Sequence, residues 1–188
     1  YLVNVTAETK EMLKRAQLAE KMGSKYVMVD ILTSGWAAVQ TLREANFKVA
    51  IHAHRAMHAA LDRNPEHGMS MMVIADFARL IGVDTLHIGT AYGKMVGGKD
   101  EVLQIENEIE LPYTKDTHKH LGQKWEGVKP VLGVASGGVY PGIVPKILNF
   151  MGKDVVLAPG VEIDLVAQVA AGHGGALDVP AGPAAAPG

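Results

Sequence analysis

The stretch "VAIHAHRAMHAAL", residues 49–61, concentrates side chains that can do chemistry inside an otherwise apolar run: His52, His54, Arg55 and His58. Histidine gains and loses a proton near neutral pH, and the guanidinium fork of arginine matches two oxygens of a phosphate group. A His–x–His pair can also bind a metal ion, although no third ligand stands at a known spacing from this one. The stretch therefore indicates an anion or proton-transfer site, with hydrogen-bonded structural histidines as the alternative, above all for His52.

Two glycine-rich segments carry further candidates. In "GTAYGKMVGGKDE", residues 89–101, Lys94 stands among four glycines. A lysine on such a loop can close over developing negative charge, and the alternative is a solvated surface lysine. In "GVASGGVYPG", residues 133–142, backbone N–H groups at Ser136, Gly137 and Gly138 can cradle a phosphate near the next helix. Turns of this kind are also common where they only connect a strand to a helix, without binding a ligand.

Two polar segments are interpreted as structural. "KDE", residues 99–101, places a lysine beside two carboxylates, but it falls where a helix begins, and acidic residues are favoured in a first helical turn. We interpret it as a helix start rather than a metal site. His118 and His120 lie in "KDTHKHLGQK", a segment with charges throughout, and we expect both to be surface residues.

The elements that must position these groups alternate along the chain. Short apolar runs typical of strands buried on both faces occupy residues 1–6, 26–30, 48–53, 85–88, 130–136 and 154–157. Amphipathic stretches typical of helices occupy residues 7–22, 34–45, 69–81, 100–110 and 141–151. Six strands that alternate with five helices predict a parallel sheet covered by helices, either an open doubly wound sheet or part of a (β/α)8 barrel.

Ligands of parallel α/β folds bind at the carboxyl ends of the strands, so the polar residues at those ends are expected to gather. Besides the residues named above, these ends carry Asn4, Thr6, Asp30 and His87. If the third run ends near His54, Arg55 follows it directly at the working edge of the sheet.

Composition narrows the class of protein. The chain has 188 residues, 48% of them hydrophobic, with a net charge of −2 and no cysteine. It can therefore build a core, offers no basic face for nucleic acid, and has neither disulfides nor thiolate metal ligands. No apolar run approaches a membrane span, which together with the lack of cysteine suits a cytoplasmic protein. The chain opens on a strand-like pattern without Met, as a piece of a longer chain would. We expect residues 158–188, rich in Ala, Gly and Pro, to be a divergent and loosely ordered tail.

Five strings, in order, resemble the large subunit of ribulose-bisphosphate carboxylase/oxygenase (RuBisCO): "YLVNVTA", "VMVDILTSG", "IHAHRAMHAALDRNPEHGM", "HIGTAYGKMVG" and "VASGGVYPG". The resemblance covers about residues 1–157, and the wording "ASGGVYPG" and "LTSGW" is closest to the archaeal form III type. It implies an incomplete (β/α)8 TIM-type barrel in which residues 1–157 supply the third to eighth strands. It also implies an enzyme, as the full-length parent, that carboxylates ribulose 1,5-bisphosphate with CO2 to two 3-phosphoglycerates, with O2 in a side reaction. Archaeal members suggest a role in nucleotide breakdown and a homodimer or larger homo-oligomer.

The resemblance assigns catalytic roles to two residues. His54 matches the family's histidine beside the metal and the sugar hydroxyls, which is implicated in proton transfer. Lys94 matches the lysine of the mobile sixth loop, which closes over the carboxylate that forms from CO2.

It also assigns substrate contacts. Arg55 and His87 match ligands of one substrate phosphate, helped by Ser136. Gly138 and Gly137 match backbone donors near the other phosphate or the sugar chain.

Three departures from the family pattern limit how many of the family's site residues can be assigned to this sequence. The family binds Mg²⁺ through a carbamylated lysine, an aspartate and a glutamate on the second barrel strand, which would precede Tyr1, so this chain is expected to hold no metal ligand and to be inactive alone. "KDE" at 99–101 sits in the wrong unit for that role. After "DVVL" the family's phosphate-binding glycine run is replaced by "APGVEIDLVAQVAAGHGG". The alternatives are a RuBisCO-like enolase of a sulfur-containing sugar phosphate and a non-catalytic remnant.

Overall fold

The described part of the chain, residues 2–64, 66–90, 92, 98–118 and 120–159 of a computed structural model, builds a parallel sheet with the order β1-β2-β3-β4-β7-β8. Its strands are β1 (Val3–Asn4), β2 (Tyr26–Asp30), β3 (Ala50–His54), β4 (Thr85–His87), β7 (Leu132–Ser136) and β8 (Val156–Ala158). The strands expected from the apolar runs are thereby confirmed, with ends shifted by a few residues. The tail predicted for residues 158–188 lies outside the described residues from position 160 onward.

The helices follow the predicted stretches. They are α1 (Thr9–Lys21), α2 (Ile31–Ser34), α3 (Trp36–Glu44), α4 (Ala59–Asp62), α5 (Met71–Ile81), α6 (Lys99–Glu110), the 3-10 turn η1 (Pro141–Ile143) and α7 (Val144–Met151). Gly35, with φ of +83°, separates α2 from α3 inside the predicted segment 34–45. The short helices α2 and α4 were not predicted, since all of α2 but its last residue precedes the predicted segment.

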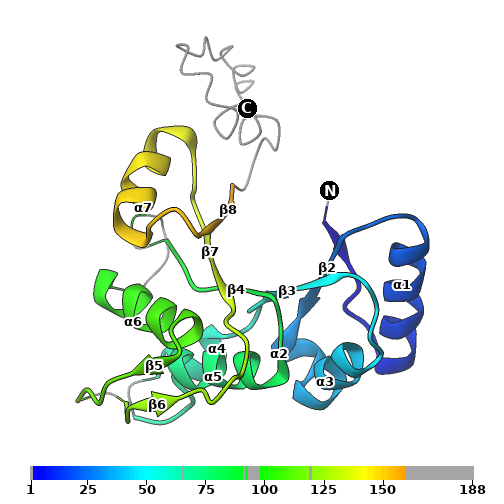
Figure 1. Ribbon diagram of the computed structural model, residues 1–188, viewed down its shortest axis with the longest axis horizontal. Coiled ribbons are helices and arrows are strands. Elements are labelled where there is room, and N and C mark those ends of the chain that lie inside the picture. The colour runs from blue at the N-terminus through cyan, green and yellow to red at the C-terminus, as the bar shows by residue number, and fades with distance from the viewer. Residues whose placement is uncertain (1, 65, 91, 93–97, 119, 160–188) are drawn as a thin grey trace, which may run out of the picture.

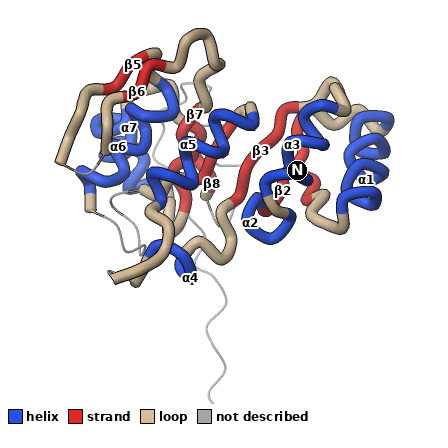
Figure 2. Tube along the Cα trace, turned by 90° about the horizontal axis from the view of Figure 1, so that it is seen from below, coloured by secondary structure: helices blue, strands red, loops and turns tan. Residues whose placement is uncertain are grey.

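The strands form an arc, and the longer helices lie along its outer side (Figure 1). Neighbouring helices α1 and α3, α3 and α5, and α5 and α6 contact one another around that side. Figure 2 shows the same order from below. Since a doubly wound sheet carries helices on both faces, this arrangement is that of an incomplete barrel, as the resemblance implies.

The core lies between the sheet and the outer helices. Val27, Val29 and Ala53 of the strands and Met12 and Ile74 of the helices have no exposed surface. Burying such side chains is the main favourable term in folding, about 1.5–3 kcal/mol for each large aliphatic residue. Burial alternates along β2 and is complete along β4, so the apolar runs predicted to be buried on both faces are buried in that way only in part.

Helix ends follow elementary backbone rules. Gly82 ends α5 in the left-handed region, with φ of 88° and ψ of 40°, and Ser70 begins it by accepting a hydrogen bond from the Val73 amide. Helix α6 begins after Gly98 and carries Asp100 and Glu101 in its first turn. The interpretation of "KDE" as a helix start is thus confirmed.

A small antiparallel hairpin, β5 (Tyr113–Thr114) and β6 (Gln123–Lys124), was not predicted. Tyr113, Gln123 and Lys124 are exposed, so the hairpin shows no alternation of apolar and polar residues. No helix within the described ranges is long and apolar enough to cross a membrane.

Candidate active site

Polar side chains meet at the carboxyl edge of the sheet. Strand β2 ends at Asp30, β3 at His54, β4 at His87 and β7 at Ser136. Asp30 and His54 stand side by side in the register of β2 and β3, and β4 pairs with both β3 and β7. The expected gathering at one edge is therefore present, because parallel strands in sequential order bring their carboxyl ends together.

Three histidine rings lie in contact at this edge. Nε2 of His52 and Nε2 of His87 are 2.6 Å apart, and the rings of His54 and His87 meet edge to face with centroids 4.7 Å apart. His52 and His54 thus share one face of β3, as strand alternation predicted. A fourth polar group, Oγ1 of Thr85, lies 2.8 Å from Nδ1 of His52.

The two buried histidines are neutral at physiological pH. Burial and, to a smaller extent, the neighbouring His54 together lower the pKa of His52 to about 4. Burial lowers the pKa of His87 to about 3, with His52, His54 and Arg55 acting in the same direction. Removal of an imidazolium from water is costly, and positive neighbours add to that cost. His87 can therefore orient an anion by hydrogen bonding, whereas charge compensation has to come from another group.

His54 is oriented by a carboxylate. Its Nδ1 lies 2.6 Å from Oδ1 of Asp30. The Thr6 hydroxyl donates to Oδ2 of Asp30 over 3.3 Å, and the Asp30 amide donates to the Thr6 hydroxyl over 2.8 Å. A carboxylate on Nδ1 favours the proton there, which leaves Nε2 of His54 as the proton acceptor. The sequence marked Thr6 and Asp30 as strand-end residues, but their pairing with His54 follows only from the strand register.

Arg55 is the first residue after β3, and 9% of it is exposed. Burial lowers the pKa of its guanidinium, while Asp62 and Glu101 oppose that effect. The guanidinium runs beside Gly89, where φ is +102° and a Cβ would lie 3.3 Å from Nη2 of Arg55. Glycine is thus required after β4 both for the backbone conformation and for the approach of the arginine.

Not every polar residue of the opening stretch joins the histidine cluster. Nδ1 of His58 lies 2.5 Å from Oδ2 of Asp62, one helical turn away. His58 therefore braces the start of α4 rather than facing His52 and His54.

The turn after β7 has the backbone form of an anion cradle. Gly137 and Gly138 both have positive φ, +93° and +75°, directly after the half-buried Ser136. Among the described residues, Ser136 forms no hydrogen bond with Arg55 or His87. Lys94 lies outside the described residues, so its predicted position over the site stays a prediction.

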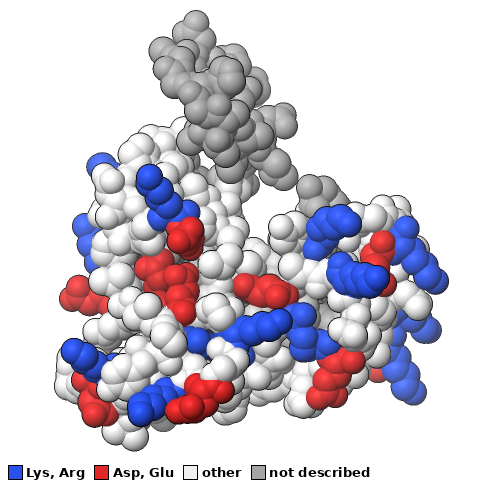
Figure 3. Space-filling model, viewed as in Figure 1, with Lys and Arg blue, Asp and Glu red and all other residues white. Residues whose placement is uncertain are grey.

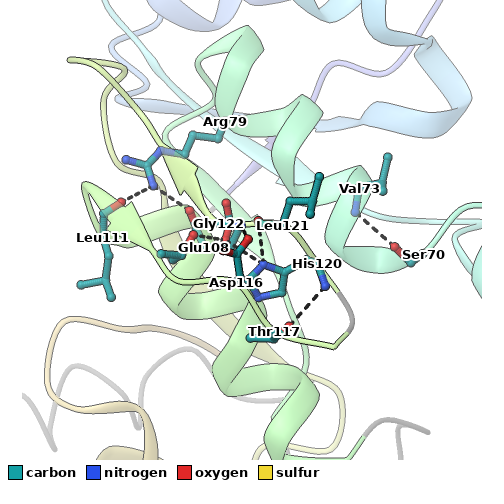
Figure 4. Close-up of polar contacts among 11 residues, drawn as sticks. Ser70, Val73, Arg79, Glu108, Leu111, Asp116, Thr117, His120, Leu121 and Gly122 are labelled. Atoms are coloured by element: carbon teal, nitrogen blue, oxygen red, sulfur yellow. Dashed lines mark hydrogen bonds and ion pairs between the residues drawn. The ribbon is translucent and has the colours of Figure 1, made fainter.

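The predicted surface position of His120 is wrong, whereas His118 is exposed as predicted. The His120 side chain is 14% exposed and lies 4.0 Å from Oε2 of Glu108. Its Nδ1 donates to the Leu121 carbonyl over 3.0 Å, and Figure 4 shows the ring facing inward beside Glu108. The hairpin folds this charged segment back onto α6, which the sequence pattern does not reveal.

Comparison with known proteins places the chain in one family. The family model described as ribulose bisphosphate carboxylase large chain, catalytic domain, matches residues 1–177. The ribulose bisphosphate carboxylase of Methanocaldococcus jannaschii is 48% identical over 162 residues, which are 85% of this chain and 38% of that protein. That of Thermococcus onnurineus is 41% identical over 192 residues, 98% of this chain and 40% of that protein.

Solved structures agree. A dimeric archaeal Rubisco from Hyperthermus butylicus superposes with a TM-score of 0.76 at 43% identity, over 85% of this chain and 38% of that one. An octameric Rubisco from Pyrococcus horikoshii in complex with sulfate gives 0.74 at 44% identity, over 85% and 35%. The chain thus spans about two fifths of the length of these relatives. Because the family model, the relatives and the solved structures agree with the barrel strands, the chain belongs to the family of the RuBisCO large chain, within its catalytic domain.

Proposed function

We propose that the protein containing this chain is an archaeal-type ribulose-1,5-bisphosphate carboxylase, which joins CO2 to the enediolate of the bisphosphate and cleaves the product to two 3-phosphoglycerates. O2 competes in a side reaction. The observation that carries the proposal is the meeting of His54, Arg55 and His87 at one rim, in a chain 48% identical to a protein of that name.

At this rim, one side chain supplies positive charge to a substrate phosphate, and other side chains orient the phosphate by hydrogen bonds. Arg55 supplies the positive charge through a fork that matches two phosphate oxygens. His87, neutral at pH 7, supplies a directed hydrogen bond, and Ser136 adds a hydroxyl at the same edge. Gly137 and Gly138 would offer amides to the second phosphate or the sugar chain, since a bisphosphate needs two separated anion sites.

Proton transfer is assigned to His54. With Nδ1 bonded to Asp30, its Nε2 can accept a proton from a sugar carbon or hydroxyl, and the carboxylate stabilises the imidazolium that results. Lys94 would bring a fixed positive charge to the carboxylate that forms from CO2.

Mg²⁺ is the metal that the family implies. Within the described ranges, no group of three or more His, Asp or Glu side chains converges as metal ligands. The residues described here therefore do not make up a magnesium site. We propose that the carbamylated lysine and its acidic neighbours lie elsewhere in the longer protein.

We further propose a homodimer or an assembly of dimers acting in the cytoplasm, in nucleotide breakdown. Solved relatives titled as dimeric and octameric support the assembly.

The direct test supplies the longer protein with ribulose 1,5-bisphosphate, Mg²⁺ and labelled CO2. Formation of two 3-phosphoglycerates per bisphosphate, one of which carries the label from CO2, supports the proposal. Exchange of the C3 proton with solvent without CO2 uptake would instead support the RuBisCO-like enolase, and neither reaction would support a non-catalytic remnant. The Lys21→Ala variant, altered at an exposed cation in the last turn of α1, is the control and should retain wild-type turnover.

A further inference from the structure

We propose that Thr85 and His52 are positioning residues, which set the tautomer of His87 so that His87 offers its Nδ1–H to a substrate phosphate. The proposal deepens the function proposed above, because it concerns how the same phosphate site is prepared.

A continuous hydrogen-bonded chain supports this role. Oγ1 of Thr85 lies 2.8 Å from Nδ1 of His52, and Nε2 of His52 lies 2.6 Å from Nε2 of His87. The exposed fractions of Thr85, His52 and His87 are 7%, 7% and 9%, so water competes little along the chain. Among the described residues, no protein group bonds Nδ1 of His87, which is the nitrogen left for a ligand.

Two neutral histidines joined through their Nε2 atoms must share one proton between those atoms. If His52 donates, its Nδ1 is bare and accepts from the Thr85 hydroxyl, and His87 carries its proton on Nδ1. If His87 donates instead, its Nδ1 presents a lone pair. Each neutral ring has one donor and one acceptor nitrogen, so no other neutral arrangement satisfies every contact.

The two directions of the hydrogen bond between His52 and His87 differ in what Nδ1 of His87 offers to a phosphate. A phosphate dianion can only accept hydrogen bonds, so a lone pair on Nδ1 of His87 would repel it, whereas an N–H would bind it. Burial keeps both rings neutral, so protonation of His87 is a costly route to a second donor. Among the described residues, the Thr85 hydroxyl has no hydrogen-bond partner other than Nδ1 of His52. Its proton is therefore paired only when it donates to that nitrogen, which is the productive direction.

The first experiment measures the tautomer directly. ¹⁵N-histidine NMR of the longer protein is recorded with sulfate, an anion that cannot donate, and His87 is assigned by the signals lost in His87→Asn. A neutral ring protonated on Nδ1 supports the proposal. A ring protonated on Nε2, an imidazolium, or no response of His87 to sulfate would overturn it. Because no turnover is needed, this result is independent of whether the protein fixes CO2.

The second experiment measures the effect on substrate. Thr85→Val removes the hydroxyl with little change of shape and should raise KM for ribulose 1,5-bisphosphate about fivefold, the cost of one buried hydrogen bond. The turnover number should change by less than about twofold, because the chain acts on binding. Thr85→Ser should restore KM.

Thr114→Val is the matched control, since the Thr114 hydroxyl is also buried, at 8% exposure, and donates to Glu108 over 2.6 Å in the hairpin. It should lower stability without changing KM. A wild-type KM in Thr85→Val, or an equal rise in Thr114→Val, would show that the hydroxyl has no positioning role.

Discussion

At the scale of single residues, the rim separates groups that stay charged from groups that stay neutral. Arg55 keeps its proton although it is buried, whereas His52 and His87 lose theirs. A doubly phosphorylated sugar would therefore be held by one guanidinium charge and several directed dipoles at this edge. Substitutions at the rim should accordingly affect binding and chemistry to different degrees.

Arg55→Ala should weaken binding of ribulose 1,5-bisphosphate by about 1.5–3 kcal/mol, the scale of hydrogen bonds to a charged group. Isothermal titration of the longer protein measures the change, with the exposed Lys21→Ala on α1 as the control. Equal affinity in wild type and Arg55→Ala would contradict the phosphate role.

Lys94→Ala should abolish carboxylation and leave part of the enolisation, since the lysine is assigned to the charge that forms only after CO2 adds. The two rates are separated by measuring CO2 fixation and solvent exchange of the C3 proton on the same samples. Unchanged CO2 fixation would refute the assignment, and loss of both rates would place Lys94 earlier in the reaction.

At the scale of elements, a buried arginine joins the hairpin to the helices. Nη1 of Arg79, on α5, donates to the Glu108 and Leu111 carbonyls at the end of α6, both over 2.7 Å. Its guanidinium carbon lies 4.3 Å from the centre of the Trp125 ring. Figure 4 shows Arg79, Glu108 and Leu111 converging at this point. The arginine thus satisfies carbonyls that a helix end leaves without intrahelical partners.

Arg79→Ala should cost about 3–5 kcal/mol of unfolding free energy, because it removes the charged donor from the Glu108 and Leu111 carbonyls, and a hydrogen bond to a charged group is worth about 1.5–3 kcal/mol. Urea unfolding of the longer protein, followed by hydrogen exchange at β5 and β6, measures the loss and locates it. The exposed ion pair of Arg15 with Glu11 gives the comparison, and Arg15→Ala should cost no more than about 1 kcal/mol. Similar losses in both variants would contradict the role of Arg79.

These elements also show what the sequence could and could not predict. The strands were predictable because their apolar residues form short, nearly continuous runs, and the long helices because burial of one face leaves a helical period in the sequence. The edge that carries His54, Arg55 and His87 followed from the parallel topology. The hairpin was not predictable, since its two-residue strands are largely exposed. The inward turn of His120 depends on that hairpin and was missed with it.

The partners of the site residues were likewise beyond the sequence. Asp30 meets His54 because β2 and β3 pair in register, and Thr85 meets His52 for the same reason in β3 and β4. Such contacts join residues 24 and 33 positions apart, and no local pattern records them.

At the scale of the whole molecule, charges of both signs are mixed on the surface, whereas a carboxyl group in the described interior lacks a partner for one of its oxygens. Basic and acidic side chains alternate over the face seen in Figure 3. Inside, 5% of Glu106 is exposed and its Oε1 has no hydrogen-bond partner within the described structure. Burial and, to a smaller extent, the nearby Glu110 together raise its pKa from 4.5 to about 7.

A raised carboxyl pKa means that the folded state holds the proton more tightly than the unfolded state. The contribution of Glu106 to stability is thus full below pH 4.5 and is lost as pH rises towards about 7. Glu106→Gln, which imitates the protonated form, should leave stability unchanged near pH 4.5 and raise it at pH 8 by up to about 3 kcal/mol. Urea unfolding at both pH values measures this, with the exposed Glu126→Gln as the control. A gain that is equal at both pH values would contradict the buried-proton explanation.

The order of the strands in the sheet is also their order along the chain, with only the hairpin set aside. Each new strand therefore finds its partner already made by the segment translated just before it. During translation the sheet can form one strand at a time, and each step closes only a short loop between neighbouring segments of the chain. For the same reason, one strand and its helix can be replaced by those of a related protein, since the replacement alters contacts only with the two neighbouring units.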